Sequence, residues 1–320
     1  MVLDADTSLL AELEPEAERL LERHLSAVKN WHPHTYVPYS RGEDFPPDYE
    51  WQPSESAMPD DVRSALYVNL LTEDNLPYYF RDIERMFGKD GAWGEWVRRW
   101  TAEEGRHSIV IRDYLTVTRA IDPLALEEGR MAQMSGGQVP EPPTAADGLI
   151  YVTLQELATR ISHRNTGTKI RNVDEVGSRI MNRVAQDENL HFLFYRDVAS
   201  AIIEVDPSQA VEAMERQICG FTMPGDGIPG FKEHAKLIAN AGIYDLAAHY
   251  TQILKPIVLT HWKLPDLTGL TAEAEAARDR TMRYIEKSRK VAERLTDRRK
   301  SREEARAQAE AEGKPVAVNA

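Results

Sequence analysis

The sequence contains a single cysteine, Cys219, among its 320 residues, so no internal disulfide can stabilise the fold. Long apolar runs are also missing, since the longest one, residues 148–154, is far too short to cross a bilayer. Its 39 basic residues are outnumbered by 52 acidic ones, and a net charge of −13 argues against nonspecific binding of nucleic acid. The first residues carry no basic segment, so we expect no signal peptide. We therefore predict a cytoplasmic protein that is neither an integral membrane protein nor a nucleic-acid binder.

Helical periodicity dominates what is present. Apolar residues recur at spacings of three and four along four long segments, about 66–87, 93–115, 149–163 and 180–202. We find no convincing set of strands with period two, so the fold class is predicted to be all-α, around a bundle of long helices. Another helix is expected at about 7–29, and a loop rich in proline and aromatic residues follows it to about residue 59.

The last part of the chain differs in composition from the rest. Residues 272–312 are rich in alanine and charge, with few large apolar side chains. We expect residues 1–270 to form one domain. We expect residues 271–320 to form a charged, solvated helical extension that frays into a disordered tail.

The four long stripes also carry the residues most suited to chemistry. Each stripe contains a glutamate, and two contain a histidine three residues further on; together these are Glu73, Glu104, His107, Glu156, Glu188 and His191. Residues three apart lie on the same face of a helix. Carboxylates on an apolar face are costly unless they are paired or bind metal, and two divalent cations would remove their mutual repulsion. Oxygen-rich ligands with one imidazole per metal favour iron or manganese over zinc.

The spacing of these residues strengthens the metal interpretation. Glu73 precedes Glu104 by 31 residues, Glu156 precedes Glu188 by 32, and the two Glu-x-x-His pairs lie 84 residues apart. The pattern is that of two copies of a helix pair, each contributing one glutamate and then Glu-x-x-His. This is the ligand set of ferritin-like di-iron carboxylate bundles, so we expect a ferritin-like di-iron four-helix bundle core with additional flanking helices. The alternative is a bundle with satisfied polar pairs in its core.

The segments around these residues resemble a known family. Residues 72–78 (TEDNLPY), 100–107 (WTAEEGRH), 155–166 (QELATRISHRNT) and 187–191 (DENLH) are similar to the soluble acyl-[acyl-carrier-protein] desaturases, most closely the actinobacterial branch. The resemblance runs in order from about Glu12 to Trp262. The family has asparagine where this chain has Gly105, and usually glycine where it has Ser108. Neither position is a ligand in the family pattern.

The resemblance implies a role for each matching residue. Glu73 and Glu156 match the single-glutamate ligands, Glu104 and Glu188 match the bridging carboxylates, and His107 and His191 match the nitrogen ligands. Two iron ions per chain, cycling between Fe²⁺ and Fe³⁺, are implied. As further catalytic residues, Thr159 matches a threonine thought to help oxygen activation, while Trp31 and Asp187, with His107, match a proposed route for electron entry.

The resemblance also implies an activity and partners. Members of the family are homodimeric, take electrons from ferredoxin, and use O₂ to insert a cis double bond into a saturated chain on acyl carrier protein. The residues alone leave other readings open. One is a di-iron enzyme of another type, such as a small-molecule N-oxygenase or a radical-generating subunit, for which Tyr195 and Tyr114 lie on suitable faces. Another is ferritin-like iron storage or metal binding without desaturase activity, and a third is a metal-free helical scaffold.

The acidic residue before each Glu-x-x-His pair suggests how the histidines are held. Ligating imidazoles usually donate their second N–H to a carboxylate. We expect Asp187 to hold His107 and Glu103 to hold His191, crosswise between helices. His163 shows no ligand spacing, and we expect it to be structural or to serve docking.

Overall fold

Helices provide the regular structure of the protein in the computed structural model, which describes residues 5–223, 225 and 227–312. No strand occurs among these residues, so the all-α prediction is confirmed. The helices are α1 Ala5–Ala27, α2 Asp60–Glu73, α3 Leu76–Phe87, α4 Gly91–Val117, α5 Pro123–Gly136, α6 Ala145–Ile170, α7 Glu175–Val205, α8 Pro207–Cys219, α9 Phe231–Asn240, α10 Leu246–His249, a π-helix Tyr250–His261, and α11 Ala272–Ala311.

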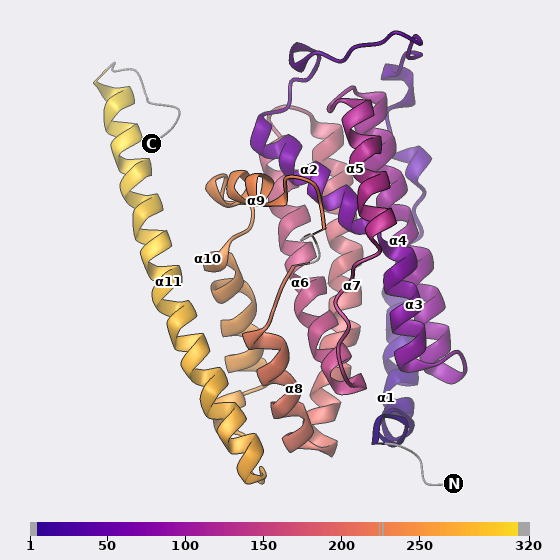
Figure 1. Cartoon of the computed structure of the whole chain (residues 1–320), viewed down its shortest axis with the longest axis vertical. Coiled ribbons are helices and arrows are strands. Elements are labelled where there is room, and N and C mark those ends of the chain that lie inside the picture. The colour runs from indigo at the N-terminus through magenta and orange to yellow at the C-terminus, as the bar shows by residue number, and fades with distance from the viewer. Residues whose placement is uncertain (1–4, 224, 226, 313–320) are drawn as a thin grey trace.

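The long helices α6 and α7 lie in the middle of the molecule, with α1, α3 and α4 on one side of them and α8, α10 and α11 on the other (Figure 1). The helix α6 contacts α7 most extensively and also packs against α1, α2, α3 and α8. Because neighbours surround it, α6 is buried on nearly all sides. This explains why its sequence is apolar without a marked polar face.

The ends of several helices follow directly from the sequence. The side chains of Asp122, Thr144, Asp174 and Asp206 each precede a helix and accept a hydrogen bond from a backbone N–H of its first turn. Such N-caps satisfy amide groups that have no partner inside the helix. Proline follows Asp122 and Asp206 directly, at a position where a missing N–H costs nothing.

The prediction of one continuous helix at about 66–87 is wrong, because this segment forms two helices, α2 and α3. The break lies at Asp74 and Asn75, directly after Glu73. Pro77 follows at the start of α3. A proline has no N–H to donate to the carbonyl of Glu73, and its ring clashes with that carbonyl, so a continuous helix cannot pass this point. Glu73 therefore occupies the last residue of α2.

The helix α11 packs against the body along its first part, while its C-terminal end stands apart from the other helices (Figure 1). Its buried residues recur at helical spacing and are mostly small, Ala274, Ala277, Thr281, Ile285 and Ala292. This stripe packs against α8 and α10, so one face of the helix that we expected to be solvated is buried. The division into two parts at residue 270 stays a prediction. The expected disordered tail falls largely on residues 313–320, which lie outside the described residues.

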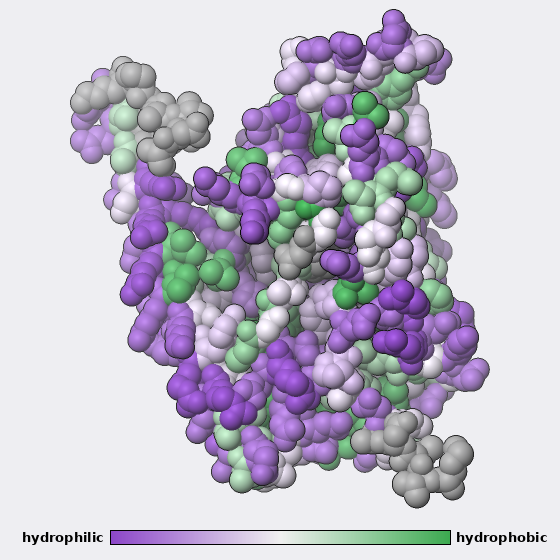
Figure 2. Space-filling view, viewed as in Figure 1, coloured by the Kyte–Doolittle hydropathy of each residue, from purple (hydrophilic) through white to green (hydrophobic). Residues whose placement is uncertain are grey.

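The surface agrees with the charged composition. The face in Figure 2 is mostly hydrophilic, with hydrophobic groups in separate patches. Within the described part of the chain, no helix is both long enough and apolar enough to cross a membrane.

Candidate metal centre

The six residues predicted as ligands come together inside the bundle. Four helices supply them: α2 ends at Glu73, α4 carries Glu104 and His107, α6 carries Glu156, and α7 carries Glu188 and His191. All six side chains are buried. They form two groups, one of Glu73, Glu104, His107 and Glu188, the other of Glu104, Glu156, Glu188 and His191. Within each group one donor atom per residue lies within 4.8 Å of the others.

The two groups overlap in a way that suits two adjacent cations. Glu104 and Glu188 belong to both groups, so each can offer one oxygen to either side. Nδ1 of His107 lies 3.1 Å from Oε2 of Glu104 and 3.3 Å from Oε1 of Glu188. Nδ1 of His191 lies 2.7 Å from Oε1 of Glu104. Both imidazoles therefore turn the same nitrogen toward the shared carboxylates.

The electrostatics of the cluster favour the binding of cations. Burial opposes charge on His107 and His191, yet Glu104 and other nearby carboxylates raise the pKa of both histidines well above the ordinary value. Burial, followed by the charge of Glu188, raises the pKa of Glu156 well above its usual range. The cluster thus holds protons that metal ions would displace.

Buried atoms that make no hydrogen bond point to the same conclusion. Among the described residues these are Oε1 of Glu104, Oε2 of Glu156 and Nδ1 of His191, although Nδ1 of His191 lies 2.7 Å from Oε1 of Glu104. Buried polar atoms of this kind are rare in proteins and need an explanation. Metal ions between the two groups would give each atom a partner, so the residues present fit a metal centre.

The structure places Thr159 and Trp100 against the carboxylates. The Thr159 hydroxyl, on α6, is 2.7 Å from Oε2 of Glu188 and 3.0 Å from the carbonyl oxygen of Glu156. The indole N–H of Trp100 donates to Oε1 of Glu156 at 3.0 Å. Both contacts fix the orientation of predicted ligands, and Thr159 offers the cluster a hydroxyl proton.

Asp187 joins Trp31 to the cluster. The indole N–H of Trp31 donates to Oδ2 of Asp187 at 2.6 Å, and the same oxygen lies 3.5 Å from Nε2 of His107. The rings of Trp31 and His107 are nearly parallel, with their centroids 6.4 Å apart. Arg106 and Arg183 both pair with Asp187. The three residues predicted as an electron route are thus neighbours, although Trp31 precedes the bundle in the chain.

The crosswise pairing predicted for the histidines is confirmed for one pair. Nε2 of His191 lies 2.9 Å from Oε2 of Glu103 in a hydrogen bond. For the other pair, Asp187 reaches His107, but at 3.5 Å Nε2 of His107 makes no hydrogen bond among the described residues. Asp187 instead satisfies Trp31 and the two arginines.

Two further histidines contact the site although the sequence did not predict that they would. Nε2 of His163 hydrogen-bonds Oε1 of Glu73 at 2.9 Å, so the expectation that it serves structure or docking missed its contact with a predicted ligand. His163 follows Glu156 by seven residues, two helical turns along the same face. His24 on α1 hydrogen-bonds Glu103 at 3.0 Å. It continues the buried stripe of Leu13, Ala17 and Leu20, which was the available signal.

The two tyrosines considered for radical chemistry have different surroundings. Tyr114 donates from its hydroxyl to Asp174 at 3.2 Å, at the start of α7. Tyr195 is fully buried, and its hydroxyl has no hydrogen-bond partner among the described residues. Tyr195 also lies against the ring of Trp96.

Comparison with known proteins gives consistent matches. A family model described as fatty acid desaturase matches residues 5–311. DesA1 of Mycobacterium tuberculosis, named as an acyl-[acyl-carrier-protein] desaturase, is 43% identical over 284 residues, covering 86% of this chain and 83% of DesA1. The stearoyl-[acyl-carrier-protein] 9-desaturase 6 of Arabidopsis thaliana is 33% identical over 265 residues, covering 77% of this chain and 66% of that protein.

A solved structure extends the comparison to the fold. The X-ray structure of DesA2 from Mycobacterium tuberculosis, named in the same way as DesA1, matches with a TM-score of 0.67 and 27% identity. The match covers 81% of this chain and 96% of that one. The predicted ferritin-like helical fold is therefore confirmed.

Proposed function

Since the chain belongs to the fatty acid desaturase family, as the resemblance predicted, we propose that it is an acyl-[acyl-carrier-protein] desaturase. The reaction would use O₂ to insert a cis double bond into a saturated acyl chain. The observation that carries the proposal is the pair of buried ligand groups that share Glu104 and Glu188. Curated relatives named for this activity, from bacteria and plants, support the substrate class.

The proposed cofactor is a pair of iron ions. Glu73 and His107 would bind one ion, Glu156 and His191 the other, and Glu104 and Glu188 would bridge them. An unactivated methylene has no acidic proton, so acid–base catalysis cannot remove its hydrogen, and reduced iron with O₂ supplies the oxidant that this step needs. The chain's own part is to orient the ligands and keep the centre away from bulk water.

Thr159 would serve the centre through its hydroxyl group. It lies within hydrogen-bond distance of Glu188, and its side chain is almost wholly buried. From there it can hold a proton next to the bridging carboxylate or orient a small molecule that enters the site. The backbone carbonyls of Gln155 and Glu156 lie 3.2 and 3.0 Å from the same hydroxyl oxygen and are alternative acceptors for its single hydrogen.

Trp31, Asp187 and His107 would carry electrons inward. The hydrogen bond from Trp31 to Asp187, the 3.5 Å approach of Asp187 to His107 and the nearly parallel rings of Trp31 and His107 support this route. Ferredoxin is the proposed donor, and a homodimer is the proposed assembly. A cytoplasmic location is proposed because one cysteine suits a reducing compartment.

The family relationship favours desaturation over the other di-iron chemistries and over storage. The hydroxyl of Tyr114 donates its hydrogen bond to Asp174 at the start of α7, and this position argues against Tyr114 as a radical site. The two ligand groups weaken the case for a metal-free scaffold, because such a scaffold has no need for shared buried carboxylates.

The test is a direct product assay. Stearoyl- and palmitoyl-carrier protein are incubated with the iron-loaded enzyme, ferredoxin, its reductase and O₂, and the acyl chain is analysed by mass spectrometry. A loss of two hydrogens is expected, and Glu104→Ala or His191→Ala should abolish it while leaving the helical circular dichroism largely intact. Glu215→Ala, which removes a surface partner of Arg280, serves as the matched control and should retain activity. An unchanged acyl chain with the fully loaded wild type would refute the proposal.

A further inference from the structure

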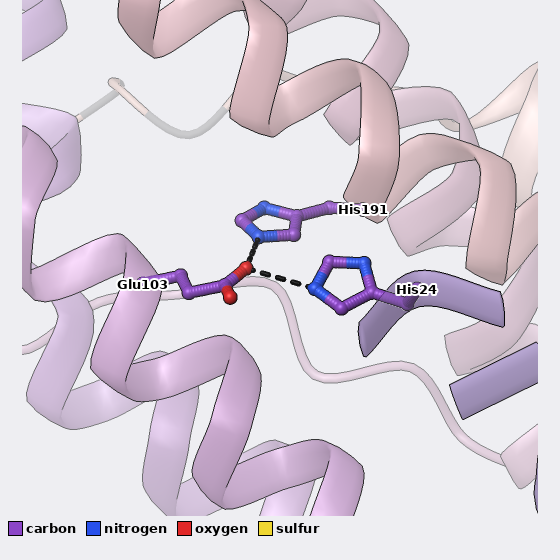
Figure 3. A group of neighbouring side chains, drawn as sticks. All are labelled: His24, Glu103 and His191. Atoms are coloured by element: carbon purple, nitrogen blue, oxygen red, sulfur yellow. Dashed lines mark hydrogen bonds and ion pairs between the residues drawn. The ribbon is translucent and has the colours of Figure 1, made fainter. Parts of the chain in front are cut away.

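A buried histidine from outside the four ligand-bearing helices reaches the candidate centre. His24 lies on α1, near the end of that helix, and is only 3% exposed. Figure 3 shows its ring facing Glu103 of α4 and beside His191 of α7. The rings of His24 and His191 are stacked with centroids 5.8 Å apart, while Trp96 meets His24 edge-on at 5.0 Å. Contacts on several sides therefore fix the ring.

Glu103 is the acceptor that His24 and His191 share. Its Oε2 lies 3.0 Å from Nε2 of His24 and 2.9 Å from Nε2 of His191, while its other oxygen accepts from Arg99. Because the guanidinium of Arg99 pairs with this carboxylate, Glu103 is the acceptor for both rings, and each Nε2 donates its hydrogen. This arrangement leaves Nδ1 of His191 as the nitrogen that faces the centre.

His24 has no other polar role among the described residues. Its second nitrogen, Nδ1, is buried without a hydrogen-bond partner. A polar ring placed in an apolar stripe is costly to bury. Its single hydrogen bond with Glu103 is thus the feature that accounts for a histidine at this position.

We propose that His24 is a positioning residue, which acts through Glu103 to fix the ring of His191 with Nδ1 toward the metal centre. The inference rests on the proposed function, because it assigns His191 to a metal. The three side chains could also hold a cation themselves. We favour the hydrogen-bonded arrangement because Arg99 already balances the charge of Glu103.

The test compares two replacements of His24. His24→Leu fills the space with an apolar side chain and removes the N–H that bonds Glu103. His24→Gln retains an N–H, because its amide can still reach Glu103. Fe²⁺ affinity is measured anaerobically, together with the near-infrared circular dichroism of the bound ions. His24→Leu should weaken Fe²⁺ binding by about tenfold, the lower end of the effect seen for partners of ligating histidines, and should change the spectrum. His24→Gln should restore both.

Controls separate positioning from general stability. His249→Gln alters another buried histidine, which bonds Tyr244 and lies outside the cluster, and should leave the affinity and spectrum unchanged. Far-ultraviolet circular dichroism of the metal-free variants checks folding. If His24→Leu does not fold, His24→Asn, whose amide is one methylene too short to reach Glu103, replaces it and should weaken binding in the same way.

Each outcome decides a specific claim. Suppose that the wild type binds iron and desaturates its substrate. If the folded His24→Leu or His24→Asn variant then keeps the wild-type Fe²⁺ affinity and spectrum, the positioning role of His24 is overturned and the proposed function stands. The positioning role is also overturned if the protein with two bound irons binds one further Zn²⁺ ion and the His24 variants do not. In that case His24 would be a metal ligand. A wild type that binds no Fe²⁺ overturns both the role of His24 and the proposed function.

Discussion

Removal of metal should leave a protein whose stability falls as the pH rises above about 6.5. His107 and His191 are buried, yet carboxylates led by Glu104 raise their pKa values well above the ordinary 6.5. A histidine whose pKa rises on folding contributes stability that is complete below the pKa of the unfolded chain. That stability is lost as the pH climbs through the folded-state pKa.

The pH dependence of the free energy of unfolding follows from the number of histidines whose pKa is raised. Between the two pKa values, each retained proton changes the free energy of unfolding by about 1.4 kcal/mol per pH unit. Two histidines therefore give a slope of up to about 2.7 kcal/mol per pH unit, or roughly 5 °C in melting temperature for a chain of this size. Glu156, whose pKa is also raised, acts in the same direction.

Guanidinium unfolding of the metal-free protein, followed by circular dichroism at several pH values, measures this slope. The double variant His107→Gln/His191→Gln should lose most of it. His249→Gln should retain it, because burial lowers the pKa of His249 to about 4 and this residue stays neutral across the range. Equal slopes for the wild type and the double variant would refute the electrostatic account of the cluster.

Three further predictions concern catalysis and packing. Thr159→Val should keep the iron stoichiometry but lower product formation, because it removes the hydroxyl beside Glu188; metal analysis and product mass check this. Trp96→Ala should cost about 3–5 kcal/mol in guanidinium unfolding, since Trp96 is fully buried and stacks on Phe194. Ala277→Asp should cost roughly 2–4 kcal/mol because it buries a charge under α11, whereas exposed Ala276→Asp should change stability by less than about 0.5 kcal/mol.

The periodicity of apolar residues predicted most of the helices that carry the ligands of the candidate centre. The stripes around Glu104, Glu156 and Glu188 fall on single continuous helices, so residues three or four apart do share a face. The break after Glu73 was missed because apolar spacing continues across it, although Pro77 was the local signal for a break.

Contacts between distant segments could not be read in the same way. His24 reaches Glu103 across 79 residues, and its helix carries no ligand motif that could have indicated this contact. The packing of α11 was missed for a related reason. Most residues of its buried face are alanines, and small residues give little hydrophobic signal while allowing helices to approach closely.

The most direct test of the account is a crystal structure of the iron-loaded protein with anomalous data collected at the iron edge. Two peaks are predicted, one among Glu73, Glu104, His107 and Glu188, the other among Glu104, Glu156, Glu188 and His191. A full-occupancy peak outside these groups, or no iron peak between them, would contradict the central claim that six buried side chains hold a pair of metal ions.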